Sequence, residues 1–204
     1  MARKKNRKGD PVHGWLNFNK PVEMTSTQAV GLVKRLFNAQ KAGHGGTLDP
    51  LADGVLPIAF GEATKTSAYA MDADKDYTFT IAWGSSTTTQ DREGDVVAQS
   101  GARASMEDIA AALATFVGDI EQVPPKFSAI KVNGERAYDL ARDGEEVELQ
   151  SRQVTLHEAR LDEASTRDEA IIHVTCGKGF YIRSLVRDLA AKLDLEGHVS
   201  ALKR

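Results

Sequence analysis

Apolar and polar residues alternate most regularly in the stretch DYTFTIAW, residues 76–83. Tyr77, Phe79, Ile81 and Trp83 occupy every second position, and threonine or alanine fills the positions between them. Successive side chains of a β-strand point to opposite faces of its sheet, so this period of two predicts a strand with two different faces. It is the clearest strand signal in the chain.

Other segments carry either a strand pattern or the spacing of an amphipathic helix. Strands are expected at residues 13–19, 55–60, 152–161 and 170–176. A strand, an Asn133–Gly134 turn and a short helix are expected within residues 126–144. Longer helices are expected at residues 26–39, 105–117 and 181–193. The first helix would place Val30, Val33 and Phe37 on one face, and the second opens with a capping-box pattern from Ser105 to Asp108. The alternation of strands and helices predicts a mixed α/β domain.

The stretch HGGTLDPLADG, residues 44–54, fits neither pattern and holds an acid between glycines and a proline. Gly45 and Gly46 permit positive φ angles, and Pro50 restricts the residue before it to extended conformations. The carboxylate of Asp49 is therefore expected to point in a defined direction. An Asp–Pro pair also starts turns and caps helices, and that purely structural role is the alternative.

The composition is that of a soluble globular protein. The 204 residues are 41% hydrophobic, which suffices to bury one good core. No apolar run approaches the roughly 18 residues of a membrane helix, and the N-terminal MARKKNRKGD lacks the apolar segment of a secretion signal. We therefore expect a cytoplasmic protein with no membrane partner. The single cysteine, Cys176, is interpreted as a buried, small apolar residue.

Charge is distributed unevenly along the chain. Residues 1–10 contain five Lys/Arg and one Asp, a net charge of +4, while residues 11–204 contain 21 Lys/Arg and 28 Asp/Glu, a net charge of −7. We expect the first segment to be a disordered basic tail that either solubilises the protein or contacts a phosphate backbone. The acidic remainder argues mildly against a nucleic-acid partner unless cations gather on one face.

Residue spacing excludes several common chemistries. Residues 61–67, GEATKTS, have Thr64 where a phosphate-binding loop needs the glycine before its lysine. The stretch from Asp72 lacks both the glycine and the final acid of a calcium loop. The five histidines show no metal-ligand spacing, and there is no G-x-S-x-G motif. No metal or nucleotide cofactor is expected, and the loop around Asp49 is the strongest remaining candidate for chemistry.

Five motifs follow one another along the chain. They are FNKPVEMTS (18–26), GHGGTLDPLADGVLPIAFGEATK (43–65), KDYTF (75–79), PPKFSAIKVNGERAYDLAR (124–142) and GFYIRSLVRDL (179–189). In content and order they resemble the motifs of the TruB family, the bacterial tRNA pseudouridine-55 synthases, and the terminal ALKR resembles the start of the family's L-x-R block. On this resemblance we identify the chain as a member of that family.

The resemblance implies an α/β (α+β) architecture, the pseudouridine synthase fold, with a mixed, largely antiparallel sheet flanked by helices. It divides the chain into the basic tail, residues 1–10, and a catalytic domain, residues 11–204. A thumb-like insertion near 124–150, a turn-rich stretch that carries four cations, is expected to clamp RNA. The family's small C-terminal RNA-binding module is absent from the sequence, and we expect the natural protein to continue beyond residue 204.

The sequence departs from the family pattern at four positions. Asn19 stands where Asp is frequent, Glu23 where Gly is frequent, Gly45 where Thr usually follows the histidine, and Asp53 where Thr is common. None of these changes removes the expected catalytic set. Glu23 and Gly45 would alter the stiffness of their loops, and Asp53 adds a negative charge near a site meant for RNA.

The resemblance also implies a reaction, the isomerisation of uridine to pseudouridine at position 55 in the T-loop of tRNA. The N-glycosidic bond is cut, the uracil turns, and its C5 is joined to the ribose. Asp49 is the implied catalyst, acting either as a nucleophile or as a base. Arg183 is implied to hold that carboxylate in place through bidentate hydrogen bonds.

Other motif residues are implied to bind the RNA. Tyr77 matches a tyrosine that stacks on the flipped target base, Leu202 an apolar wall of the same pocket, and His44 a residue that takes up the space vacated by the base. Lys20 and Lys65 match site or phosphate contacts. The expected partner is the T-arm of tRNA, bound by a monomer without a protein partner.

Two other functions remain open from the sequence. One is a synthase that is guided by RNA or acts on another RNA, although the compact core without basic extensions counts against it. The other is a non-catalytic RNA binder that remodels tRNA and retains Asp49 only by descent. Loss of tritium from C5 of the uridine would separate catalysis from mere binding.

Overall fold

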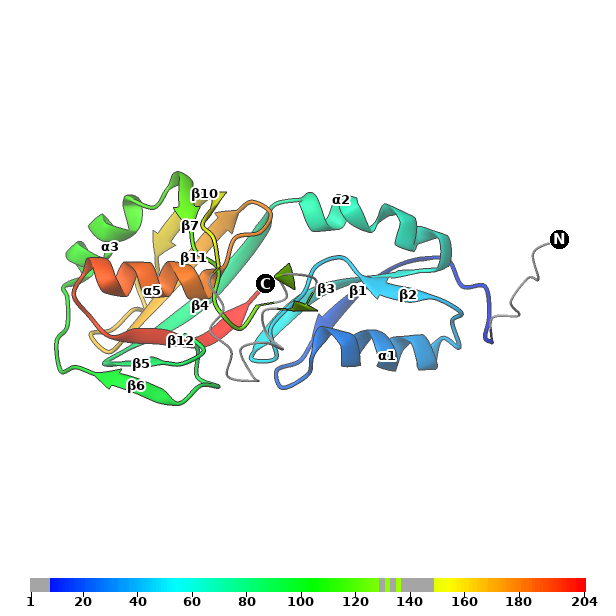
Figure 1. The fold of residues 1–204 in the computed structure, drawn as a ribbon, viewed down its shortest axis with the longest axis horizontal. Coiled ribbons are helices and arrows are strands. Elements are labelled where there is room, and N and C mark those ends of the chain that lie inside the picture. The colour runs from blue at the N-terminus through cyan, green and yellow to red at the C-terminus, as the bar shows by residue number, and fades with distance from the viewer. Residues whose placement is uncertain (1–7, 129–130, 133–134, 137–148) are drawn as a thin grey trace. The chain divides into compact units, whose positions relative to one another are not determined.

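The structure, a computed structural model, describes residues 8–128, 131–132, 135–136 and 149–204. These residues form two compact units, and Figure 1 shows the elements of each. The first unit comprises residues 1–73 with 203–204, and the second comprises residues 74–202. Most of the predicted basic tail, residues 1–7, lies outside the described residues.

The first unit is built on an antiparallel sheet in which strand β3 (Ala52–Phe60) pairs with both β1 (Gly14–Lys20) and β2 (Ala42–His44). It also contains the helix α1 (Ser26–Leu36), the 3₁₀ helix η1 (Gly61–Thr66) and the helix α2 (Ser67–Asp72). The register runs from Gly14 opposite Phe60 to Lys20 opposite Gly54. The end of β1 therefore lies beside the start of β3, where the glycine-rich loop ends.

Helix α1 begins where the sequence supplies a cap. Thr25 and Gln28 form a complete capping box, in which each side chain accepts a hydrogen bond from the other residue's backbone N–H. The buried face consists of Ser26, Ala29 and Val33. The predicted face was therefore only partly right, since Phe37 lies just beyond the helix and is about half exposed.

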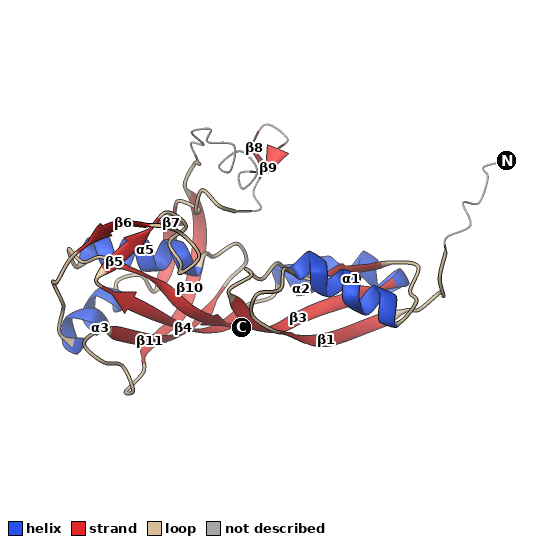
Figure 2. Ribbon diagram, turned by 90° about the horizontal axis from the view of Figure 1, so that it is seen from below, coloured by secondary structure: helices blue, strands red, loops and turns tan. Residues whose placement is uncertain are grey.

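The second unit is a sheet of five strands in the order β12-β4-β11-β10-β7. These strands are β4 (Lys75–Trp83), β7 (Gly118–Gln122), β10 (Arg152–Leu161), β11 (Glu169–Cys176) and β12 (Gly197–Lys203), whose last residue belongs to the first unit. The pairs β4–β11, β11–β10 and β10–β7 are all antiparallel. The sheet carries the helices α3 (Met106–Ala114) and α5 (Ile182–Lys192), and α3 packs against both β10 and α5 (Figure 2).

Two small ribbons complete the second unit. Strands β5 (Ser85–Thr87) and β6 (Val96–Gln99) pair antiparallel, as do β8 (Lys131–Val132) and β9 (Glu135–Arg136). The turn predicted at Asn133–Gly134 and the short helix predicted after it lie outside the described residues. The RNA-clamping role of residues 124–150 therefore stays a prediction.

The core confirms the strongest sequence patterns. Phe79, Ile81 and Trp83 of β4 are buried, as the alternation requires. Ser105 caps α3 as predicted, since its hydroxyl accepts a hydrogen bond from the N–H of Asp108 and donates one to the Asp108 carboxylate at 2.7 Å. No helix of the described residues is long and apolar enough to cross a membrane.

Cys176 lies at the end of β11 and is 1% exposed. Burial in apolar surroundings raises the pKa of its thiol to about 12. The sulfur therefore stays protonated at neutral pH and is not a nucleophile. Its predicted role as a small apolar core residue is confirmed.

Candidate active site

Asp49 lies in a loop, residues 45–51, that joins β2 to β3 in the first unit. The residue before it is fixed by Ser26, the first residue of α1. The Leu48 N–H donates to the Ser26 Oγ at 2.9 Å, and the Ser26 hydroxyl donates to the Leu48 carbonyl at 3.0 Å. Ser26 is 3% exposed, so this reciprocal pair is shielded from water. The helix start thereby holds the N-terminal side of Asp49.

The residue after Asp49 is fixed by the end of β1. The Pro50 carbonyl accepts hydrogen bonds from the Lys20 ammonium at 3.4 Å and from the Glu23 N–H at 2.8 Å. The Lys20 Nζ also donates to the carbonyls of Pro21 and Met24 at 2.8 and 2.7 Å, and the residue is fully buried. A buried ammonium requires such partners. In this structure Lys20 braces the loop, a role that the expectation of a substrate contact did not include.

Arg204 closes the loop from another side. Its guanidinium donates through Nε to the Val55 carbonyl at 2.9 Å, through Nη1 to Thr47 at 3.4 Å and through Nη2 to Gly46 at 3.3 Å. Its backbone accepts from the Val55 N–H at 3.0 Å and donates to the Asp53 carbonyl at 3.1 Å. One side chain thus links the start of the loop that carries Asp49 to the strand β3 that follows it.

Two glycines in the stretch 44–54 are required by this arrangement. Gly46 and Gly54 have φ angles of +127° and +103°, which side-chain-bearing residues rarely adopt. A Cβ atom at Gly54 would lie 2.2 Å from the Arg204 carbonyl oxygen. These glycines therefore allow Arg204 to approach the backbone closely.

The structure bears on three departures from the family pattern. Glu23 has a φ of +64°, so glycine is the unstrained choice at this turn. A Cβ at Gly45 would lie 2.7 Å from the Cβ of Ala70 in α2, so threonine would not fit without a shift of that helix. Asp53 lies 4.0 Å from the Lys203 ammonium, and this cation offsets part of its added charge.

Two more predicted residues belong to the first unit. His44 is the last residue of β2, opposite Ile58, and directly precedes the loop. Lys65 lies in η1 with a side chain that is 69% exposed, and it pairs with Glu62. His44 thus directly precedes the candidate catalytic loop in the sequence. Lys65 is instead a solvent-exposed cation paired with an acidic residue.

In the second unit, Arg183 lies in the first turn of α5 and is 5% exposed. It forms an ion pair with Asp91 at 3.6 Å. Its guanidinium also donates to the carbonyls of Thr89 at 3.3 Å and Phe127 at 3.0 Å. Arg183 is therefore held in a fixed position by two separate segments, residues 89–91 and Phe127, and its implied bidentate bonds to Asp49 stay a prediction.

The start of α5 is itself held by Gln122, which is 1% exposed. Its side-chain amide accepts from the Tyr181 N–H at 2.8 Å and donates to the Tyr181 carbonyl at 3.2 Å. Tyr181 is the N-cap residue of α5 and has no capping bond from its own side chain. Gln122 instead binds the backbone of this N-cap residue from β7 and so fixes the start of the helix turn that carries Arg183.

Sequence reasoning missed Asp91. It is 2% exposed, and its Oδ1 accepts hydrogen bonds from the Thr89 hydroxyl at 2.5 Å and from the Glu93 N–H at 3.0 Å. These bonds and the pairing with Arg183 satisfy a carboxylate that would be expensive to bury alone. In the polar stretch TTTQDREGD, nothing distinguishes it from a surface acid.

Tyr77 and Leu202 lie on neighbouring strands of the second unit, β4 and β12. Gly197 of β12 approaches Trp83, while the Ser200 hydroxyl donates to the Thr80 carbonyl at 3.3 Å, so the two strands run in opposite directions. Leu202 therefore lies towards the end of β4 that carries Tyr77. Leu202 is buried, and Tyr77 is partly exposed.

A family model covers most of the chain. Residues 34–182 match the model described as "TruB family pseudouridylate synthase (N terminal domain)". The chain belongs to the TruB family. The matched segment includes the Asp49 loop, β4 with Tyr77, and the first residue of α5.

Curated TruB relatives match the whole chain. The "tRNA pseudouridine synthase B" of Caulobacter sp. (strain K31) is 58% identical over all 204 residues, which span 65% of that protein. The protein of the same name from Bartonella quintana (strain Toulouse) is 52% identical, and the chain spans 76% of it. The TruB chain described here is therefore just under two thirds as long as the Caulobacter relative.

Solved structures support the TruB fold. A chain in the crystal structure of a Cbf5–Nop10–Gar1 complex matches 98% of this chain with a TM-score of 0.71 and 27% identity, over 55% of its own length. One in an archaeal box H/ACA sRNP Nop10–Cbf5 complex matches all of it with a TM-score of 0.68 and 25% identity, over 53% of its length. The predicted α/β pseudouridine synthase fold is confirmed.

The geometry of the TruB loop suits acid–base or nucleophilic chemistry. Backbone hydrogen bonds on both sides of Asp49 fix the direction in which its carboxylate leaves the chain. A preset direction matters because a reacting group must be held close to its attack geometry. Among the described residues, no three His, Cys, Asp or Glu side chains form a group that could hold a metal ion.

Proposed function

We propose that the chain converts uridine to pseudouridine in tRNA, at position 55 of the T-loop. The observation that carries this proposal is Asp49, an acid braced on both sides by hydrogen bonds from the buried residues Ser26 and Lys20, in a chain of the TruB family. Relatives named tRNA pseudouridine synthase B at 52–58% identity support tRNA as the substrate. We further propose that the protein acts as a cytoplasmic monomer.

The reaction is an internal rearrangement of one nucleotide. The bond from C1′ to N1 breaks and a bond from C1′ to C5 forms, while C5 loses a proton and N1 gains one. Electrons and atoms balance without an oxidant or a second substrate. Asp49 supplies an ionised carboxylate at the ribose, either as a nucleophile on the sugar or as a base that removes a proton.

The other predicted residues are assigned to RNA. Tyr77 stacks on the flipped uracil, because aromatic stacking tolerates rotation of the base. Arg183 contributes a fixed positive charge beside the Asp49 carboxylate and the reacting nucleotide, and Leu202 an apolar wall. His44 takes up the space vacated by the base. Lys65, whose side chain is largely exposed, is assigned a phosphate contact.

Two alternatives compete with this proposal. An RNA-guided synthase is suggested by the solved neighbours, one from a complex with Nop10 and Gar1 and the other from a box H/ACA sRNP complex with Nop10. The identity is 25–27% to those chains against 58% to the Caulobacter protein, which favours the tRNA enzyme. A non-catalytic RNA binder would use the same surfaces but would leave the uridine unchanged.

Tritium release tests the proposed function. A T-arm stem-loop whose target uridine carries tritium at C5 is incubated with the chain, since C5 must lose its hydrogen when it joins C1′. We expect release from the intact stem-loop and none when the target uridine is replaced by cytidine labelled at the same position. Tight binding of the stem-loop without any release would instead identify a non-catalytic RNA binder.

Arg204→Met is expected to slow turnover by about 10²-fold, the size of effect that a displacement of about 1 Å can have on a reacting group. Methionine keeps much of the side-chain length but removes the donors to Gly46, Thr47 and Val55. The measurement is the single-turnover rate of tritium release at saturating RNA. Arg103→Met, which removes an arginine paired with Asp168 in the second unit, is the matched control and should keep the rate. Equal rates for Arg204→Met and the parent would show that Arg204 does not position Asp49.

A further inference from the structure

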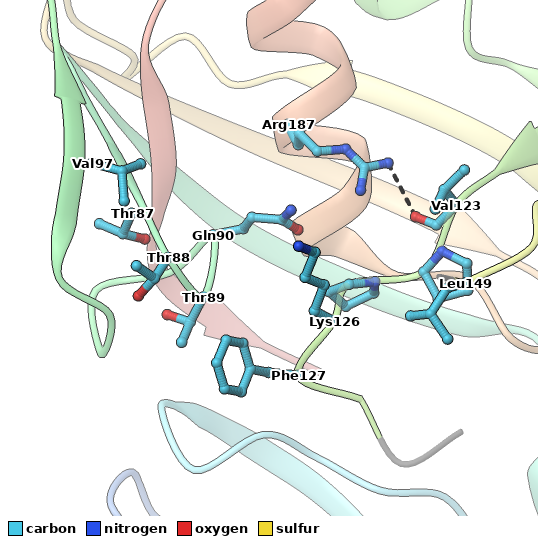
Figure 3. Close-up of a pocket in the computed structure, with 12 residues that line it drawn as sticks. Thr87, Thr88, Thr89, Gln90, Val97, Val123, Lys126, Phe127, Leu149 and Arg187 are labelled. Atoms are coloured by element: carbon cyan, nitrogen blue, oxygen red, sulfur yellow. Dashed lines mark hydrogen bonds between the residues drawn. The ribbon is translucent and has the colours of Figure 1, made fainter. Parts of the chain in front are cut away.

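The second unit contains a pocket that has no assigned ligand, although one of its walls belongs to the segment 124–150 that is expected to clamp RNA. It has a volume of about 580 Å³, within the range of small-ligand sites. One wall is the segment Thr87–Gln90 with Val97 of β6, and the other is the segment Val123–Phe127 with Leu149. Arg187 of α5 lies between the two walls (Figure 3).

Arg183 ties the two walls of this pocket together. Its guanidinium donates to the carbonyl of Thr89 on one wall and to that of Phe127 on the other. The pocket therefore lies directly beside the residue that we assign to the reacting nucleotide. A ligand that occupies the pocket while the target uridine reacts must be a close neighbour of that uridine.

The lining combines three kinds of group that recognise single-stranded RNA. Phe127, Val97 and two prolines provide an apolar surface for a base. Lys126 and Arg187 are cations, and none of the described lining residues is acidic. Arg187 is partly neutralised by Asp188, at 2.7 Å, so Lys126 provides most of the positive charge. Stacking surfaces beside cations are typical of proteins that bind unpaired nucleotides.

Gln90 adds a strained polar group to the same wall. Its φ of +65° is unusual for a residue with a side chain, and such strain concentrates at binding sites. Its Oε1 is buried and accepts no hydrogen bond from the described residues. In Figure 3 its amide extends from the threonine wall into the space where Lys126 also points. An amide in this position can hydrogen-bond to the edge of a base.

We propose that this pocket binds the unpaired nucleotide adjacent to the target uridine. Its base stacks on Phe127 and reaches the Gln90 amide, while Lys126 contacts its phosphate. This inference rests on the proposed function, because it identifies the occupant by its place next to the uridine that reacts. It adds a second nucleotide subsite, coupled to the first through Arg183.

The test is a thermodynamic cycle between protein and RNA. Val97→Trp fills the pocket from an exposed strand position, and its control is Val96→Trp, the preceding residue of β6, which is similarly exposed and does not line the pocket. Each protein is titrated with the intact T-arm stem-loop and with stem-loops that carry one abasic nucleotide on the 5′ or 3′ side of the target uridine.

We expect the abasic change at one of these two positions to weaken binding to the parent chain between about fivefold and about 150-fold, the range of one base–aromatic stack. Val97→Trp should weaken binding of the intact RNA by a similar factor. With the RNA that is abasic at this position, the same substitution should cause little further loss of binding, because the base that it displaces is already missing. Val96→Trp should bind each RNA as the parent does. The pocket proposal would be overturned if the binding losses caused by Val97→Trp and by the abasic change were additive at both the 5′ and the 3′ position.

Two further measurements separate this inference from the proposed function. Lys126→Gln should make the slope of log K against log salt shallower by about 0.7, the contribution of one phosphate contact to a single strand. An unchanged slope would contradict the phosphate contact. Tritium release by the parent chain is followed with the same RNAs. Release together with additive binding losses would overturn the pocket alone, whereas absence of both release and binding would overturn both proposals.

Discussion

Asp49→Asn is expected to reduce pseudouridine formation by at least about 10³-fold, equivalent to about 4 kcal/mol of added barrier. Asparagine keeps the shape of the side chain but can act neither as a base nor as a nucleophile. The bonds that brace the loop are made by the backbones of Leu48 and Pro50 and by Arg204, so the substitution leaves them in place. Turnover should fall while the fold and much of the RNA binding persist.

The measurement is the single-turnover rate of tritium release, combined with thermal unfolding and filter binding of the stem-loop. Asp53→Asn is the matched control, because Asp53 lies four residues away and its carboxylate is 4.0 Å from the Lys203 ammonium. It should keep both the rate and the melting temperature close to those of the parent. If Asp49→Asn retained turnover within tenfold of the parent, the assignment of Asp49 as catalyst would be wrong.

The sequence predicted the elements that have long, regular patterns. Strands β4, β10 and β11 and helix α5 are each at least eight residues long, and their ends lie within one residue of the predictions. The short strands β2, β5 and β6 were missed, because three or four residues are too few to show a period. They exist through pairing with distant segments, which a local pattern does not record.

In the candidate site, too, features set by adjacent residues could be predicted and contacts between distant residues could not. Asp49 was found because the glycines and the proline around it are adjacent in sequence. Its braces were not, because Ser26 and Arg204 act on residues that are 22 and up to 158 positions away. Asp91 was missed for a related reason, since an acid in a polar loop reveals its burial only when Arg183 packs against it.

Asp91→Asn is expected to lower the free energy of unfolding by about 3 kcal/mol, the loss seen when one partner of a buried ion pair is removed. Asparagine keeps an oxygen that can accept from the Thr89 hydroxyl and the Glu93 N–H, so the change removes chiefly the charge that faces Arg183. Turnover should fall as well, because the guanidinium is then held less firmly. Urea denaturation and tritium release measure the two effects separately.

The double variant Asp91→Asn/Arg183→Met decides whether Arg183 serves stability or the reaction. Removing both charges leaves no uncompensated ion in a site where both side chains are at most 5% exposed. Its stability should therefore lie well above the sum of the two single losses, since buried ion pairs are often replaced by neutral groups at little net expense. Turnover should nevertheless stay as low as in Arg183→Met alone, because the positive charge assigned to the reacting nucleotide is gone. Recovery of turnover together with stability would show that Arg183 only supports the fold, and strictly additive stability losses would show that the 3.6 Å pairing contributes nothing.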